Sequence, residues 1–213
     1  EILSTKIPSK KPIIGFLPYW NVSDPQIQYH LIDWLAYFDV GLNADGTIKK
    51  MEGSNLDMGW YWLSSGKVDH IFETCDKADV KKMLIITAFN NETIDTLVSN
   101  ENSKKNAIKS IKTLVEEYNF QGVNLDFEYN SGSTIPIQGN SQNYNQFIID
   151  LKKAIPEIEI SVCLYANGFI KNFPYQVEKL TEADHLIVMG YDFHGLYSTI
   201  AGPVAPLKSS TGP

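Results

Sequence analysis

Short apolar runs alternate with helical periods along the chain, and this alternation predicts the elements of the fold. Six runs have the length and composition of buried strands; they are Pro12–Tyr19, Trp34–Val40, Met83–Phe89, Gly122–Glu128, Ile158–Tyr165 and His185–Tyr191. The third run is apolar on both faces, which is typical of a sheet that helices cover. Turn residues such as Asn43–Gly46 separate the runs.

Between the runs, apolar residues recur every three or four positions, which predicts helices. The predicted helices are residues 66–79, 107–118, 141–155 and a shorter stretch that contains Val177 and Leu180. Ser141 can cap the third helix, and Pro156 ends it. Strands that alternate with helices indicate a parallel sheet, because parallel neighbours need long crossover connections.

The run Gly122–Glu128 decides between two parallel architectures, an open doubly wound sheet and a closed eight-stranded barrel. Its alternate residues Asn124, Asp126 and Glu128 share one face, and apolar residues share the other. Three polar side chains cannot lie beneath a packed helix without a large desolvation cost. In a barrel they point into the lumen, toward the C-terminal mouth where barrel enzymes place their chemistry. We therefore expect an α/β fold of the TIM (β/α)8-barrel type.

The chain is short for that fold. Eight units need about 250 residues, whereas this chain has 213 residues and shows only about the first six β/α units. Its last residues, 202–213, are rich in turn formers. We therefore expect residues 1–213 to be a single domain that is truncated at its C-terminus, within the loop after strand six. A partner that supplies the missing strands is the alternative, and no residue supports it.

Composition and charge exclude several classes of function without choosing one. The net charge is −7 and all 18 basic residues are lysines; without the bidentate arginine fork, no nucleic-acid partner is expected. No apolar run approaches the roughly 18 residues of a membrane span. Cys75 and Cys163 fit no metal-ligand spacing, and we expect neither a metal nor a cofactor. We also expect a monomer.

Asp126 and Glu128 carry the candidate chemistry. Two residues apart on a strand, they project the same way, with backbone positions separated by about 6.6 Å. At that distance one charge raises the pKa of the other carboxyl, which keeps an acid protonated near neutrality for donation to a leaving oxygen. A hydrogen-bonded polar plug or a metal site remains the alternative.

Residues Phe120–Glu128 resemble the D-G-x-D-x-D-x-E signature of glycoside hydrolase family 18, the chitinases and related N-acetylglucosaminidases. Met189–Asp192 is similar to the second family motif, M-x-Y-D, and residues 201–207 look like the loop that follows it in bacterial members. Gly15–Trp20 and Ala36–Val40 resemble the first two strands of the family. The resemblance covers all six predicted strands and implies a bacterial-type member.

The resemblance implies substrate-assisted hydrolysis that retains configuration, with no covalent enzyme ester. Glu128 is implied to be the general acid and later the base. Asp126 is implied to orient the acetamido group of the substrate, whose carbonyl attacks the anomeric carbon, and Tyr191 to bond that carbonyl oxygen. Candidate substrate-binding residues are Asp192, Asn124, Met189, Phe16, Tyr19, Phe38 and Trp60.

Gln121 and Asn124 depart from the signature, which has Asp at both positions. Asn124 can hydrogen-bond Asp126 but cannot carry a proton. The leading hypothesis is a secreted or cell-surface hydrolase of β-1,4-linked N-acetylglucosamine polymers such as chitin. The alternatives are a peptidoglycan or N-glycan core endo-N-acetylglucosaminidase and, in another class, a non-catalytic chitin-binding lectin. The retained Glu128 favours an enzyme.

Overall fold

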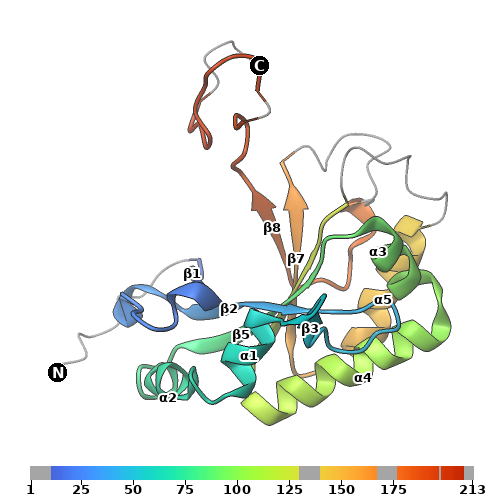
Figure 1. Cartoon of the computed structure of the whole chain (residues 1–213), viewed down its shortest axis with the longest axis horizontal. Helices are drawn as coiled ribbons and strands as arrows, with labels where there is room; N and C mark the ends of the chain where they lie inside the picture. The colour runs from blue at the N-terminus through green and yellow to red at the C-terminus, as the bar shows by residue number, and fades with distance from the viewer. Residues whose placement is uncertain (1–10, 130–139, 167–176, 197, 209–213) are drawn as a thin grey trace.

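The computed structural model describes residues 11–129, 140–166, 177–196 and 198–208. Its centre is a parallel sheet with six strands in the order β1-β2-β5-β6-β7-β8 (Figure 1). The strands are β1 (Ile14–Pro18), β2 (Trp34–Gly41), β5 (Lys81–Ala88), β6 (Gly122–Phe127), β7 (Glu159–Tyr165) and β8 (His185–Met189). These strands confirm all six predicted runs, and each lies beside the next run along the chain, as in a TIM barrel.

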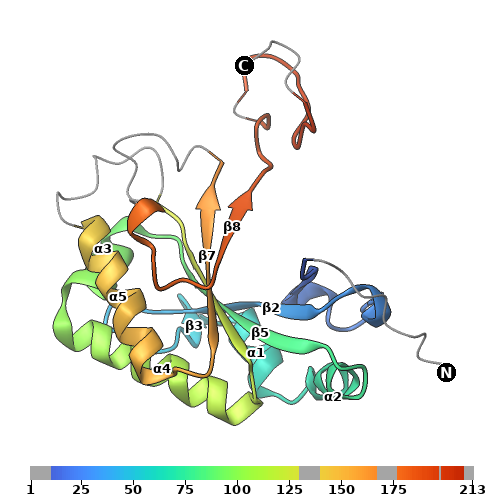
Figure 2. The same cartoon turned by 180° about the vertical axis from the view of Figure 1, so that it is seen from behind.

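The sheet is curled, and its helices lie on one side of it (Figures 1 and 2). The helices are α1 (Met58–Ser64), α2 (Asp69–Lys77), α3 (Asn91–Ser99), α4 (Glu101–Tyr118) and α5 (Asn140–Ala154), with a 3-10 turn at Val177–Lys179. Within the described residues, β1 and β8 each pair with one strand only. The result is a half-barrel, which confirms the expected partial TIM barrel.

Three predicted helices are confirmed as α2, α4 and α5, but α1, α3 and a small hairpin were not predicted. The hairpin joins β3 (Met51–Glu52) to β4 (Asn55–Leu56). Asn100 explains the missed boundary between α3 and α4, because it ends one helix and its side chain caps the next by accepting from two backbone N–H groups. Ser141 lies inside the first turn of α5, which begins at Asn140, so its predicted capping position is wrong.

The two faces of the sheet have different surroundings. The large apolar core lies between the sheet and the helices, and we call the face of the sheet that borders it the outer face. This core includes Val123, Leu125 and Phe127. The inner face carries a smaller apolar cluster around Trp34 and Met83. Gly122 makes room for this cluster, because a Cβ there would lie 2.8 Å from the Trp34 ring. The polar residues of β6 alternate with those of the outer face and therefore line the inner face, as predicted.

An ion cluster closes the N-terminal end of the inner face. The Glu159 carboxylate accepts a hydrogen bond from Lys81 at 2.8 Å and lies 2.8 Å from His185. The Lys81 ammonium also lies 4.7 Å from the centre of the Trp34 ring. This ion cluster lies opposite the carboxyl ends of the strands, where barrel enzymes place their chemistry.

Candidate active site

The signature residues form one row of polar groups at the mouth of the half-barrel. Asn124 and Asp126 lie in β6, and Glu128 follows directly after its last residue, Phe127. Asn124 is fully buried, Asp126 is 5% exposed and Glu128 is half-buried. Because alternate side chains on a strand point the same way, the three groups rise in a row toward solvent.

The amide of Asn124 is held by the neighbouring strand β7. Its Nδ2 donates to Ser161 Oγ at 2.8 Å, and the Cys163 thiol donates to its Oδ1 at 3.1 Å. The register of the two strands places Asn124 opposite Ser161. Both ends of this neutral side chain are therefore engaged with β7, rather than with Asp126 as the sequence suggested.

Asp126 is a buried carboxyl with an available acceptor atom. Its Oδ1 accepts no hydrogen bond from the described residues. Burial, together with the negative charge of Glu128, raises the pKa of Asp126 from 3.8 to about 7, against a hydrogen bond from Cys163 that lowers it. A buried oxygen without a protein donor can accept an N–H from a bound ligand, and such a contact would remove a cost of burial.

Glu128 is placed by the strands on both sides of β6. Its backbone N–H donates to the carbonyl oxygen of Ala88 at 2.9 Å, and its carboxyl shares a hydrogen bond with the Tyr165 hydroxyl. Tyr165 also donates to the carbonyl oxygen of Tyr129 at 3.4 Å. Burial and then the bond to Glu128 raise the pKa of Tyr165, so in that bond the phenol is the donor, and its one hydrogen serves either the Glu128 carboxylate or the Tyr129 carbonyl oxygen. The sequence pattern alone does not indicate Tyr165 as a site residue.

The second motif lies at the end of β8. Met189 is buried as the last residue of this strand and is paired in register with Tyr165. Tyr191 is 53% exposed, yet burial and then the charge of Asp126 raise the pKa of its hydroxyl to about 12. Asp192 has a left-handed backbone with φ 58°. The fold thus brings Tyr191 within electrostatic reach of Asp126 from two strands away.

The predicted aromatic residues divide between the two faces. Phe16 is exposed on β1, and Phe38 packs against the inner cluster. Trp20, which the sequence analysis did not select, is 58% exposed and lies edge-to-face with Phe38 at 6.0 Å between ring centres. Tyr19 and Trp60 are partly buried against the outer core, as packing anchors are. The structure therefore groups Phe16 and Phe38, but not Trp60, with the inner face.

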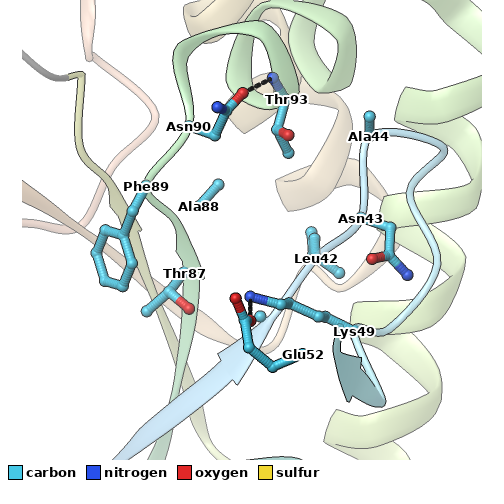
Figure 3. Close-up of a pocket in the computed structure, with 11 residues that line it drawn as sticks. Leu42, Asn43, Ala44, Lys49, Glu52, Thr87, Ala88, Phe89, Asn90 and Thr93 are labelled. Atoms are coloured by element: carbon cyan, nitrogen blue, oxygen red, sulfur yellow. Dashed lines mark hydrogen bonds and ion pairs between the residues drawn. The ribbon is translucent and has the colours of Figure 1, made fainter. Parts of the chain in front are cut away.

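A cavity of about 400 Å³ lies beside this row, at the carboxyl ends of β2 and β5. Figure 3 shows Phe89 on one side of it and the Lys49–Glu52 ion pair on another. Thr87 lines the cavity and is the register partner of Asp126. Asn124, Asp126 and Glu128 do not line this cavity, which adjoins their row through Thr87.

The described residues contain neither a metal-binding cluster nor a membrane-spanning helix. In these parts of the chain, no three or more His, Cys, Asp or Glu side chains are grouped so that they could hold a metal ion. No helix among the same residues is long and apolar enough to cross a membrane.

Replacing Asp126 with asparagine is expected to remove part of a pH-dependent loss of stability. The pKa of Asp126 is about 7 in the folded protein and near 3.8 without burial, so stability falls as the pH rises from about 4 through 7. We expect Asp126→Asn to be more stable than the parent by about 2–4 kcal/mol at pH 8 and similar to it at pH 4. Urea unfolding measures this, and an equal gain at both pH values would contradict it.

A parallel barrel sheet with two coupled carboxyls at its mouth, and a tyrosine near them, defines the class of barrel-type glycoside hydrolases. The family model described as "Glycosyl hydrolases family 18" matches residues 12–212. The chain therefore belongs to glycosyl hydrolases family 18.

Relatives and solved structures agree with this assignment. A "Probable endochitinase" of Caenorhabditis elegans is 23% identical over 80% of this chain and 28% of that protein. The Ostrinia furnacalis Group IV chitinase in complex with allosamidin has a TM-score of 0.80 at 21% identity, covering 96% of this chain and 57% of that chain. The GH18 chitinase from Cycas revoluta in complex with (GlcNAc)3 has a TM-score of 0.74 at 23% identity, covering 94% and 61%.

These likenesses confirm the fold and correct one expectation. The chain spans 28% of the nematode relative and 57% of the Ostrinia structure. The expected bacterial type is not supported, because the curated relatives come from fungi, animals and a plant.

Proposed function

We propose that the protein hydrolyses β-1,4 bonds in N-acetylglucosamine polymers, chitin first among them, with retention of configuration. The observation that carries the proposal is the buried Oδ1 of Asp126, which accepts no hydrogen bond from the described part of the chain and lies on the same face as Glu128 at the mouth of the barrel. Family membership and the chitinases among the similar proteins support this substrate. A "Secreted chitinase LysM12" of Penicillium expansum, 29% identical over 44% of this chain, supports an extracellular location.

Each residue has a part in the proposed reaction. Glu128 protonates the glycosidic oxygen while the acetamido carbonyl oxygen of the substrate attacks the anomeric carbon and the leaving sugar departs. Asp126 accepts the acetamido N–H and stabilises the positive oxazolinium ring. Tyr191 donates to the acetamido oxygen. Glu128, now ionised, then takes a proton from the water that opens the ring, which restores the starting state.

The two alternatives differ in substrate and in class. Peptidoglycan and N-glycan cores also contain N-acetylglucosamine, and the neutral Asn124 does not distinguish them from chitin. A lectin would bind the polymer without cutting it. The test is incubation of the full-length protein with a fluorogenic chitobioside: release of the fluorophore supports the proposal, whereas binding to chitin without release would favour the lectin.

A thiazoline analogue of the cyclised sugar should inhibit competitively, because it resembles the intermediate and not the substrate. Tyr191→Phe should weaken this inhibitor by a few fold, because the thiazoline sulfur stands in place of the acetamido oxygen and accepts only a weak hydrogen bond from the phenol. Inhibition constants for the two proteins measure this. Equal inhibition of parent and variant would show that the Tyr191 hydroxyl does not contact the acetamido group.

A further inference from the structure

Asp39 lies near the end of β2, where the pairing with β5 shifts register between Tyr37 and Val40. Thr87 Oγ1 on β5 donates a hydrogen bond to Asp39 Oδ2 at 2.5 Å. Thr87 is 3% exposed and is paired in register with Asp126 on β6. Asp39, Thr87 and Asp126 therefore follow one another across three adjacent strands at the mouth of the barrel.

The position of Asp39 is fixed from two sides. Helix α1 packs against its backbone so closely that a Cβ at Gly59 would lie 2.2 Å from the Asp39 carbonyl oxygen. The Tyr37 hydroxyl donates to the Gly59 carbonyl oxygen at 2.7 Å and ties α1 to β2. Thr87 holds the side chain from the other side. The carboxyl is thus kept in one place beside the row of polar groups on β6.

Asp39 places negative charge two strands away from Asp126, on the far side of Thr87. Burial raises the pKa of Asp39 to about 6, against the hydrogen bond from Thr87. A carboxyl with this pKa is mostly ionised at neutral pH, and its charge contributes to the raised pKa of Asp126. The titratable groups that interact with Asp39 are Asp57, Lys49, Tyr19, Tyr37 and Asp126.

The D-G-x-D-x-D-x-E signature has an aspartate, which can carry negative charge, at the position of the neutral Asn124. We propose that Asp39 is a positioning residue that supplies this charge from the β5 side and so retains the proton of the Asp126–Glu128 pair at neutral pH. The inference rests on the proposed function, because this is the proton that Glu128 donates. It adds a residue from β2 to a site whose signature lies on β6.

The test compares Asp39→Asn with the parent in the full-length protein. Loss of the charge should lower the titration midpoint of the Asp126 carboxyl, followed by ¹³C NMR, by a few tenths of a pH unit, because Asp39 is the smallest of the influences on that carboxyl. The basic limb of the pH–rate profile, measured on a chitobioside, should likewise move to lower pH. Turnover at acidic pH should change little, because the pair already holds its proton there.

Three further variants make the comparison specific. Glu92→Gln makes the same kind of change at an exposed position in the first turn of α3 and should shift neither curve. Asn124→Asp in the Asp39→Asn background returns a charge to the signature position and should move the basic limb back up. Thr87→Val keeps the carboxyl but removes a hydrogen bond that favours its ionised form, so it should give a smaller shift in the direction of Asp39→Asn.

An Asp126 midpoint that moves no further in Asp39→Asn than in Glu92→Gln would overturn the proposal. If Asp39→Asn does not fold, the Asp126 midpoint of Thr87→Val is compared with that of Glu92→Gln instead, and an equal midpoint in these two variants would overturn the proposal. The titration needs no turnover, so the two proposals can fail separately. A shifted midpoint in a protein that releases no fluorophore would refute the proposed hydrolysis of chitin and leave the charge coupling standing.

Discussion

Glu128→Gln is expected to lower turnover of a chitobioside by about a thousandfold while sugar binding stays within a few fold of the parent. Glutamine keeps the size of the side chain and its contact with the Tyr165 hydroxyl, but it has no proton acidic enough to give to a leaving oxygen. The measurements are kcat from fluorophore release and Kd from calorimetry with an N-acetylchito-oligosaccharide.

The control for Glu128→Gln is Glu92→Gln, which replaces an exposed carboxylate away from the row and should keep parental turnover. Near-parental turnover in Glu128→Gln would remove this residue from the acid role. Loss of binding together with turnover would instead assign it a structural role, because glutamine would then have failed to keep the site in shape. Only the split between kcat and Kd identifies a residue that acts in the transition state.

The strands could be predicted from the sequence because each has its own local pattern of apolar and polar residues. In β6, apolar residues on the outer face alternate with Asn124 and Asp126 on the inner face, and the structure has this arrangement. This alternation lies within one strand, so the sequence of that strand predicts it without knowledge of the neighbouring strands. The half-barrel followed from the order of such strands and their helices.

Residues that join the site from other strands were not predicted. Tyr165, Thr87 and Asp39 reach the row only through the registers of β7, β5 and β2. Spacing along the chain does not give register, and a single carboxylate or hydroxyl at a strand end is a common surface feature. Helix α1 was missed for a related reason, since its seven residues are too few to show a helical period clearly.

Asp126→Asn is expected to lower kcat by about a hundredfold or more, although the same change should stabilise the protein at pH 8. Asparagine still offers an oxygen to an acetamido N–H, but it has no negative charge to place against the oxazolinium ring, and preorganised charge is the larger contribution. Measurement of kcat beside urea unfolding at the same pH tests both effects in one protein.

Higher stability together with lower turnover in Asp126→Asn would show why the protein keeps a carboxyl at a position where burial disfavours its charge. Such a result would mean that the energy lost on burying Asp126 is recovered when positive charge develops on the substrate. Full turnover in Asp126→Asn would separate this residue from the reaction. Detection by mass spectrometry of a sugar ester on Asp126 in the parent would instead assign the carboxylate the role of nucleophile and exclude the acetamido route.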